Sequence, residues 1–141
     1  MYYLIYISTA IELMGQQELS EILNKSRNNN AEHNITGILL YSEGIFLQAL
    51  EGAESAVNEV YSKIEQDKRH KNLIILITGE ADDRMFPEWS MAFTTIDPVK
   101  LELLEGYINP QKKELFKGDE STSAISILKT FADSNNLTFT V

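Results

Sequence analysis

One short segment, IFLQAL at positions 45–50, constrains the fold more than any other. Its spacing and its β-branched and aromatic residues predict a strand, in which successive side chains point to opposite faces. Positions 46, 48 and 50 then share one face, and positions 45, 47 and 49 share the other. Both faces are largely apolar, so both need cover. The segment therefore predicts a sheet with a layer packed on each side.

Gln48 is the exception in this segment, because it is the polar side chain in an apolar run. A carboxamide offers two donors and two acceptor lone pairs, and burying it without partners costs about 1–3 kcal/mol. Most buried amides are satisfied by the fold itself. If a bound molecule satisfies Gln48 instead, this strand is the floor of a binding site.

The order of the predicted elements gives the fold class. Apolar and β-branched runs predict strands, with a hairpin at positions 42–44, over Tyr2–Ser8, Ile35–Tyr41, Ile45–Glu51, Leu73–Thr78 and Trp89–Thr95. Helical spacing predicts helices over Gln16–Asn28, ended by asparagines 28–30, and from Ala53 to near Asp67. This order predicts an α+β fold. Its core is ferredoxin-like, β-α-β-β-α-β, with an added fifth strand.

Asp97-Pro98 divides the chain into two predicted parts. Residues 1–96 form the domain, and residues 97–141 form a C-terminal helical extension with an amphipathic helix near 124–132. The two core helices can cover only one face of the sheet. We therefore expect the extension to pack on the other face, behind the strand that carries Gln48.

Composition excludes several classes of function. The net charge of -9 disfavours binding to a nucleic-acid backbone, and the absence of cysteine excludes thiolate metal sites and fits the cytoplasm. No apolar run approaches the roughly 20 residues that span a membrane. The two histidines, His33 and His70, lack metal-ligand spacing, so no metal site is predicted. Glu51 and the pair Asp82-Asp83 are expected to be surface carboxylates.

Tyr6 is predicted to meet Gln48 inside the fold. In a ferredoxin-like sheet the first and third strands are neighbours, which brings the Tyr6 phenol within reach of the carboxamide. The asparagines at positions 28–30 are expected above the same region. Taken singly, Tyr6 is most simply a core aromatic and the asparagines a helix cap. Together these neutral donors and acceptors suit a planar heterocycle better than a hydrolytic substrate.

These residues also stand in the order and spacing of a known family. The matching segments are LIYIS at 4–8, Asn29-Asn30, NITG at 34–37, FLQALEG at 46–52, Asp67 with Arg69-His70, and WSM at 89–91. Over roughly residues 1–96 the chain resembles the BLUF domain, a flavin-binding sensor of blue light. The resemblance implies a photoreceptor rather than an enzyme, with FAD as the usual cofactor and FMN as the alternative.

The resemblance implies a role at each matched position. Tyr6 would be the electron donor to the photoexcited flavin, and Gln48 would bridge the Tyr6 hydroxyl and the flavin N5/O4 edge. Trp89 and Met91 would compete to be the neighbour of Gln48. The other implied cofactor contacts are Asn29 and Asn30 at the O4/N3 edge, Ile22, Ser26, Ile38 and Phe46 in the pocket wall, and Lys63, Asp67 and His70 toward the ribityl and phosphate end.

Two other functions remain open at this point. One is a small acylphosphatase-like hydrolase, which needs an anion-binding arginine near a glycine-rich turn, and none is evident. The other is an interaction module that binds no flavin. The extension is too short for a cyclase or phosphodiesterase domain. We therefore expect output through a downstream signalling protein and a homo-oligomer, with no nucleic-acid or membrane partner.

Overall fold

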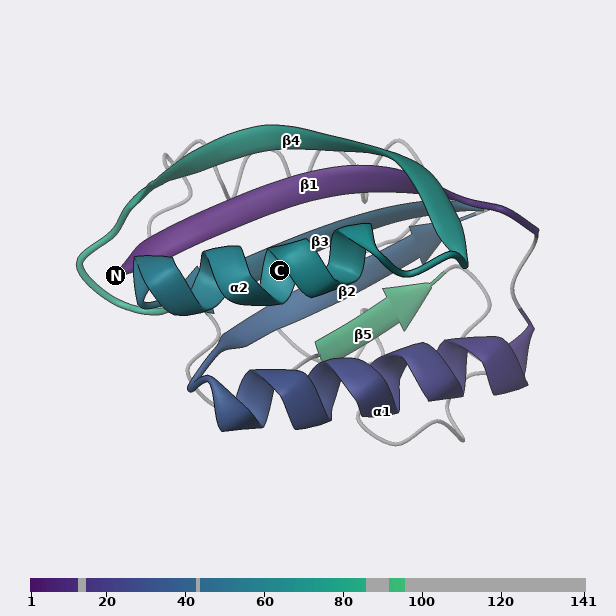
Figure 1. The fold of residues 1–141 in the computed structure, drawn as a ribbon, viewed down its shortest axis with the longest axis horizontal. Helices are drawn as coiled ribbons and strands as arrows, with labels where there is room; N and C mark the ends of the chain where they lie inside the picture. Colours follow the sequence, from purple (N-terminus) through teal and green to yellow (C-terminus); the bar gives the residue numbers. More distant parts are fainter. Residues whose placement is uncertain (13–14, 43, 86–91, 96–141) are drawn as a thin grey trace, which may run out of the picture.

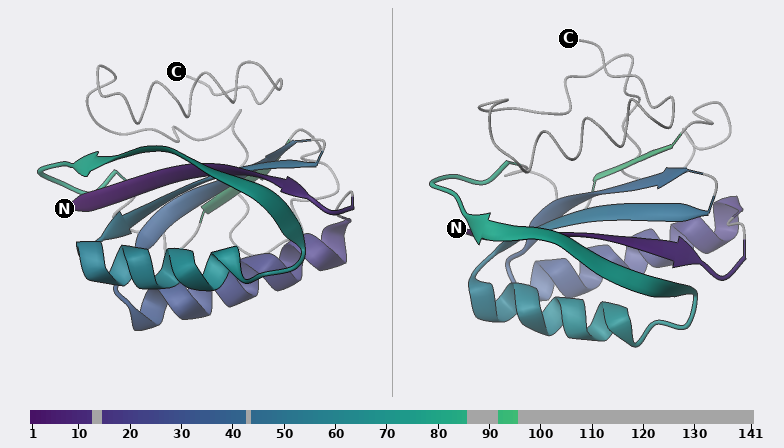
Figure 2. Two further views of the ribbon diagram at one scale, coloured as in Figure 1. Left: turned by 45° about the horizontal axis from the view of Figure 1, so that its top comes forward. Right: turned by 90° about the horizontal axis from the view of Figure 1, so that it is seen from above.

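Two helices lie on one face of a five-stranded sheet (Figures 1 and 2). The computed structural model describes residues 1–12, 15–42, 44–85 and 92–95. The elements, in chain order, are β1 (Tyr2–Ala10), α1 (Gln16–Glu32), β2 (Thr36–Ser42), β3 (Ile45–Gly52), α2 (Glu54–Glu65), β4 (His70–Glu80) and β5 (Ala92–Thr95).

The sheet order is β4-β1-β3-β2-β5. β1 lies between β3 and β4 and is antiparallel to both, and β2 is antiparallel to β3. This arrangement confirms the ferredoxin-like core. β5 adds a fifth strand beside β2, parallel to it. Of the strand predicted at 89–95, the described part is Ala92–Thr95, and the predicted helical extension (97–141) lies outside the described residues.

Both helices bury one apolar stripe against the same face of the sheet. α1 contributes Leu19 and Leu23, spaced four residues apart, and α2 contributes Val57, Val60 and Tyr61. Residues at this spacing lie on one side of a helix. The stripes pack on the face of the sheet that carries Tyr6 and Gln48, so the helices form the walls around these two residues.

The end of α1 corrects the sequence prediction. The asparagines at 28–30 lie within the helix, which runs to Glu32. Asn34 is the residue in the left-handed region, with φ 54°. The Ile35 amide donates to the Asn30 carbonyl at 2.8 Å and the Asn34 amide to the Ala31 carbonyl at 3.4 Å, which is a Schellman termination. Asn29 and Asn30 are therefore held by helical geometry rather than in a loop.

The opposite face of the three central strands is also buried at its centre. Its side chains are at most 1% exposed at Ile5, Ile38, Leu40, Leu47 and Ala49. This confirms the prediction that both faces of β3 are covered, except at Ile45, which is 37% exposed. Both described helices lie on the other face (Figure 2).

Glu51, at the end of β3, is buried and not a surface carboxylate as predicted. It accepts hydrogen bonds from the Thr36 hydroxyl and the Met85 amide, each at 2.7 Å. Arg84 donates to the Thr36 hydroxyl at 2.9 Å and to the Asn34 carbonyl at 2.8 Å. These contacts tie the end of α1 to the start of β2 and the end of β3, which fixes the positions of two pocket walls.

Candidate functional site

A pocket opens between α1, the end of α2 and the inner face of β1 and β3. Its empty space, including the solvent at its open mouth, is about 590 Å³. The lining contains most of the residues predicted for a cofactor site: Tyr6, Ile22, Ser26, Asn29, Asn30, Phe46, Gln48, Lys63, Asp67 and His70. The fold thus gathers residues from five separate elements and one loop.

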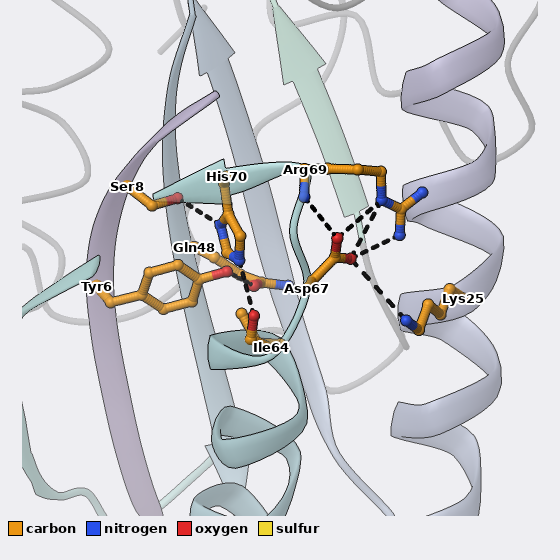
Figure 3. A network of polar contacts seen from close by, with 8 residues as sticks. All are labelled: Tyr6, Ser8, Lys25, Gln48, Ile64, Asp67, Arg69 and His70. Carbon is orange, nitrogen blue, oxygen red and sulfur yellow. Dashed lines mark hydrogen bonds and ion pairs between the residues drawn. The ribbon is translucent and has the colours of Figure 1, made fainter. Parts of the chain in front are cut away.

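Tyr6 and Gln48 form the buried polar pair of this pocket. They are direct cross-strand partners on β1 and β3, and their exposed fractions are 3% and 2%. The Tyr6 hydroxyl donates a hydrogen bond to Oε1 of Gln48 (Figure 3). Burial raises the pKa of the Tyr6 phenol above its usual range, with smaller contributions from Tyr61 and Asp67. Tyr6 therefore keeps its proton and aims it at the carboxamide oxygen.

His70 stands beside this pair, at the start of β4. Its Nε2 lies 2.7 Å from the Ile64 carbonyl oxygen, and its Nδ1 lies 2.8 Å from Oγ of Ser8 (Figure 3). The imidazole centroid is 6.4 Å from the ring centroids of both Tyr6 and Phe46, in edge-on geometry. The sequence placed His70 with the charged residues, but its side chain packs among the aromatic rings.

A charged cluster occupies another part of the pocket. Asp67 accepts from the Arg69 side chain at 2.6–3.2 Å and from the Arg69 amide at 3.0 Å, and Lys25 lies 3.9 Å from its Oδ2 (Figure 3). These hydrogen bonds from Arg69 are the main reason that the pKa of Asp67 falls to about 2. Lys25, Lys63 and Arg69 all line the pocket. Cations therefore gather here in a protein of net charge -9.

Strand alternation corrects one predicted contact. Ile38 pairs with Ala49 and lies on the opposite face of the sheet, so it does not line the pocket. Its neighbour Leu39 pairs with Gln48 and does line it. Counting in twos along β2 from the partner of Gln48 would have identified Leu39.

Four further lining residues were missed from the sequence: Lys25, Val60, Ile64 and Arg69. Helical spacing carries a signal for three of them, since Lys25 follows Ile22 by three residues and Val60 and Ile64 flank Lys63 on α2. Trp89 and Met91, predicted beside Gln48, lie outside the described residues.

Comparisons with known proteins find relatives of the N-terminal part of the chain. The family model described as "BLUF: Sensors of blue-light using FAD" matches residues 1–92. The beta subunit of a photoactivated adenylate cyclase from Euglena longa is 39% identical over 93 residues, which is 65% of this chain and 11% of that protein. The chain thus spans a small part of the length of this curated relative.

Two solved structures of light-responsive proteins are also similar to this chain. BlsA in its ground state is 28% identical with a TM-score of 0.67, and the match covers 99% of this chain and 90% of that one. A bacterial light-regulated adenylyl cyclase is 33% identical with a TM-score of 0.64, covering 97% of this chain and 35% of that one.

Within the described residues, no helix is long and apolar enough to cross a membrane.

Proposed function

The chain belongs to the BLUF family of flavin-dependent blue-light sensors, and on this premise we propose that the pocket around Tyr6 and Gln48 is its photoactive site. The observation that carries the proposal is the buried hydrogen bond from Tyr6 to Gln48, which faces that pocket. The chain would act as a sensor, without catalysis of its own.

The donors and acceptors of the pocket fit an isoalloxazine ring. Asn29, Asn30 and Gln48 offer neutral amide groups, which match the imide and ring-nitrogen edge of a flavin. Ile22, Leu39, Phe46, Val60 and Ile64 supply the apolar wall that a planar ring requires. We propose Ser26 as a further contact, since it lines the same wall from α1.

We propose FAD as the cofactor, with FMN as the alternative to be tested. Lys25, Lys63 and Arg69 supply the positive charges that a phosphate-bearing tail needs, and Asp67 holds Arg69 in place. Mass spectrometry of the cofactor released from purified protein, with titrations of both flavins into the flavin-free chain, decides between them. Tighter binding of FMN, or FMN as the released species, refutes FAD.

The bound flavin supplies the absorption of blue light and, when excited, the capacity to accept an electron. Tyr6 is the donor in the proposed mechanism, and its phenol becomes strongly acidic once it has lost an electron. The hydrogen bond to Gln48 gives the phenolic proton a direct path from Oη to Oε1. Tyr6 later regains the electron and the proton, and Gln48 remains rotated or tautomerised. Such a two-state hydrogen-bond network stores the light signal.

Absorption spectroscopy tests the function directly. The purified chain loaded with FAD should be yellow, shift its absorption slightly to the red under blue light, and return in the dark. A chain that binds no flavin, or a flavin-loaded chain whose spectrum does not change, contradicts the proposal. Phosphatase activity toward acylphosphates would support the hydrolase alternative instead.

We also propose that residues 97–141 cover the back of the sheet and pass the signal to a protein partner or to another copy of the chain. The buried back face of β1, β2 and β3 supports this, because both described helices lie on the other face. Removing residues 97–141 should expose that face, raise the binding of a hydrophobic dye and leave the spectral change intact. Light scattering in the dark and under blue light tests the change of assembly.

A further inference from the structure

Both ring nitrogens of His70 are held by partners from other elements. Oγ of Ser8, on β1, lies 2.8 Å from Nδ1, and the Ile64 carbonyl, at the end of α2, lies 2.7 Å from Nε2. Ser8 is buried and stands two residues after Tyr6 on the same face of β1. The two contacts join three elements around the photoactive pair (Figure 3).

The chemistry of these partners fixes the proton on the ring. A carbonyl oxygen can only accept, so Nε2 must carry the hydrogen that it donates to Ile64. In the neutral ring Nδ1 then holds a lone pair, and the Ser8 hydroxyl is the donor that meets it. The two contacts therefore set the orientation of the imidazole as well as the hydrogen on Nε2.

We propose that Ser8 is a positioning residue, which fixes the orientation of the His70 ring in the pocket wall beside Tyr6. The inference rests on the proposed function, because it concerns the surroundings of the tyrosine that gives up an electron. The imidazole centroid is 6.4 Å from the Tyr6 ring.

The same arrangement gives His70 a different task from the one expected from the sequence. With Nδ1 bonded to Ser8 and Nε2 to Ile64, the ring has no nitrogen left to bind a phosphate. The ring instead lies in edge-to-face geometry beside the rings of Tyr6 and Phe46. His70 is therefore a wall of the ring pocket, and the cations Lys25, Lys63 and Arg69 serve the charged part of the cofactor.

Nitrogen-15 NMR of histidine-labelled full chain tests the assignment. In the dark, flavin-loaded protein, we expect a proton on Nε2 of His70 and a hydrogen bond at its Nδ1. In Ser8→Ala the Nδ1 signal should move to the position of a nitrogen without that donor, and Ser8→Thr, which keeps the hydroxyl, should restore it. An Nε2 without a proton, or an Nδ1 without a hydrogen bond, in the unmodified protein overturns the proposal.

Dark recovery provides the functional readout. Ser8→Ala should keep the light-induced red shift, because Tyr6 and Gln48 are unchanged, but recover at least threefold faster since the wall beside them is less fixed. Recovery within twofold of the unmodified protein in Ser8→Ala refutes the positioning role. If Ser8→Ala does not fold, the NMR of the unmodified chain still decides the proposal. An unmodified chain with no red shift refutes the photoreceptor function instead, while the NMR decides the state of His70 separately.

Discussion

Asp67 offers a test of the pocket electrostatics through the substitution Asp67→Asn, which keeps the shape of the side chain and removes its charge. In the folded protein Asp67 accepts from the Nε and Nη2 atoms of Arg69 and from its backbone amide, and it faces Lys25. The asparagine presents one acceptor oxygen in place of two. The variant therefore loses the forked contact with the guanidinium.

The magnitude follows from the pKa of Asp67, which falls from 3.8 to about 2 on folding. A decrease of this size corresponds to about 2.4 kcal/mol, since one pKa unit is about 1.36 kcal/mol. The side chains of Asp67, Arg69 and Lys25 are 17%, 31% and 57% exposed, so water screens part of this interaction. We expect Asp67→Asn to lower the free energy of unfolding by about 1–1.5 kcal/mol at pH 7.

Urea unfolding at several pH values, with equal flavin content in all variants, measures this difference. Because the folded pKa of Asp67 is lowered, its contribution is present above about pH 4 and disappears as the pH falls toward 2. The gap between the two proteins should therefore narrow on acidification. The matched control is Asp82→Asn at an exposed position, which should change stability by less than about 0.5 kcal/mol. An equal gap at pH 7 and pH 3 refutes the reasoning.

Three further predictions concern residues that lie outside the pocket lining. Gly79→Ala places a Cβ 2.6 Å from the Tyr3 hydroxyl oxygen and should destabilise the protein by about 1 kcal/mol. In a Tyr3→Ala background the same substitution should leave the urea midpoint unchanged, because the clashing side chain is gone. The pKa of His33 should lie above 6.5, mainly because the ring bonds the Asn29 carbonyl, and NMR should show a lower His33 pKa in Glu59→Gln. The stability that protonated His33 contributes is present below pH 6.5 and is lost as the pH rises through the raised pKa. Glu51→Ala leaves two half-buried donors without their acceptor and should destabilise by about 2–4 kcal/mol in urea, whereas Glu51→Gln should lose less.

Strand periodicity made the core of the site predictable. Alternation along β1 and β3, together with the element order, placed Tyr6 beside Gln48, and the two are direct partners in the sheet. The same rule places Leu39, not Ile38, in the pocket. The error at Ile38 arose because that contact was carried over from the resemblance without counting faces.

Contacts between distant segments could not be predicted in this way. Ser8 and His70 are 62 residues apart, and their contact depends on the register of β4 against β1. The burial of Glu51 depends on Met85, 34 residues away. The end of α1 was misplaced because any asparagine tolerates left-handed geometry, and the one that adopts it is Asn34, directly before the buried Ile35.

The hydrogen bond from Tyr6 to Gln48 is the central element of the proposed photocycle, and Tyr6→Phe removes it by deleting one oxygen atom. The decisive measurement is the absorption difference between dark and illuminated protein, recorded for Tyr6→Phe, Gln48→Ala and the unmodified chain at equal flavin content. We predict a reversible red shift in the unmodified chain and none in either variant, although both still bind flavin. A normal, reversible red shift in Tyr6→Phe contradicts the account.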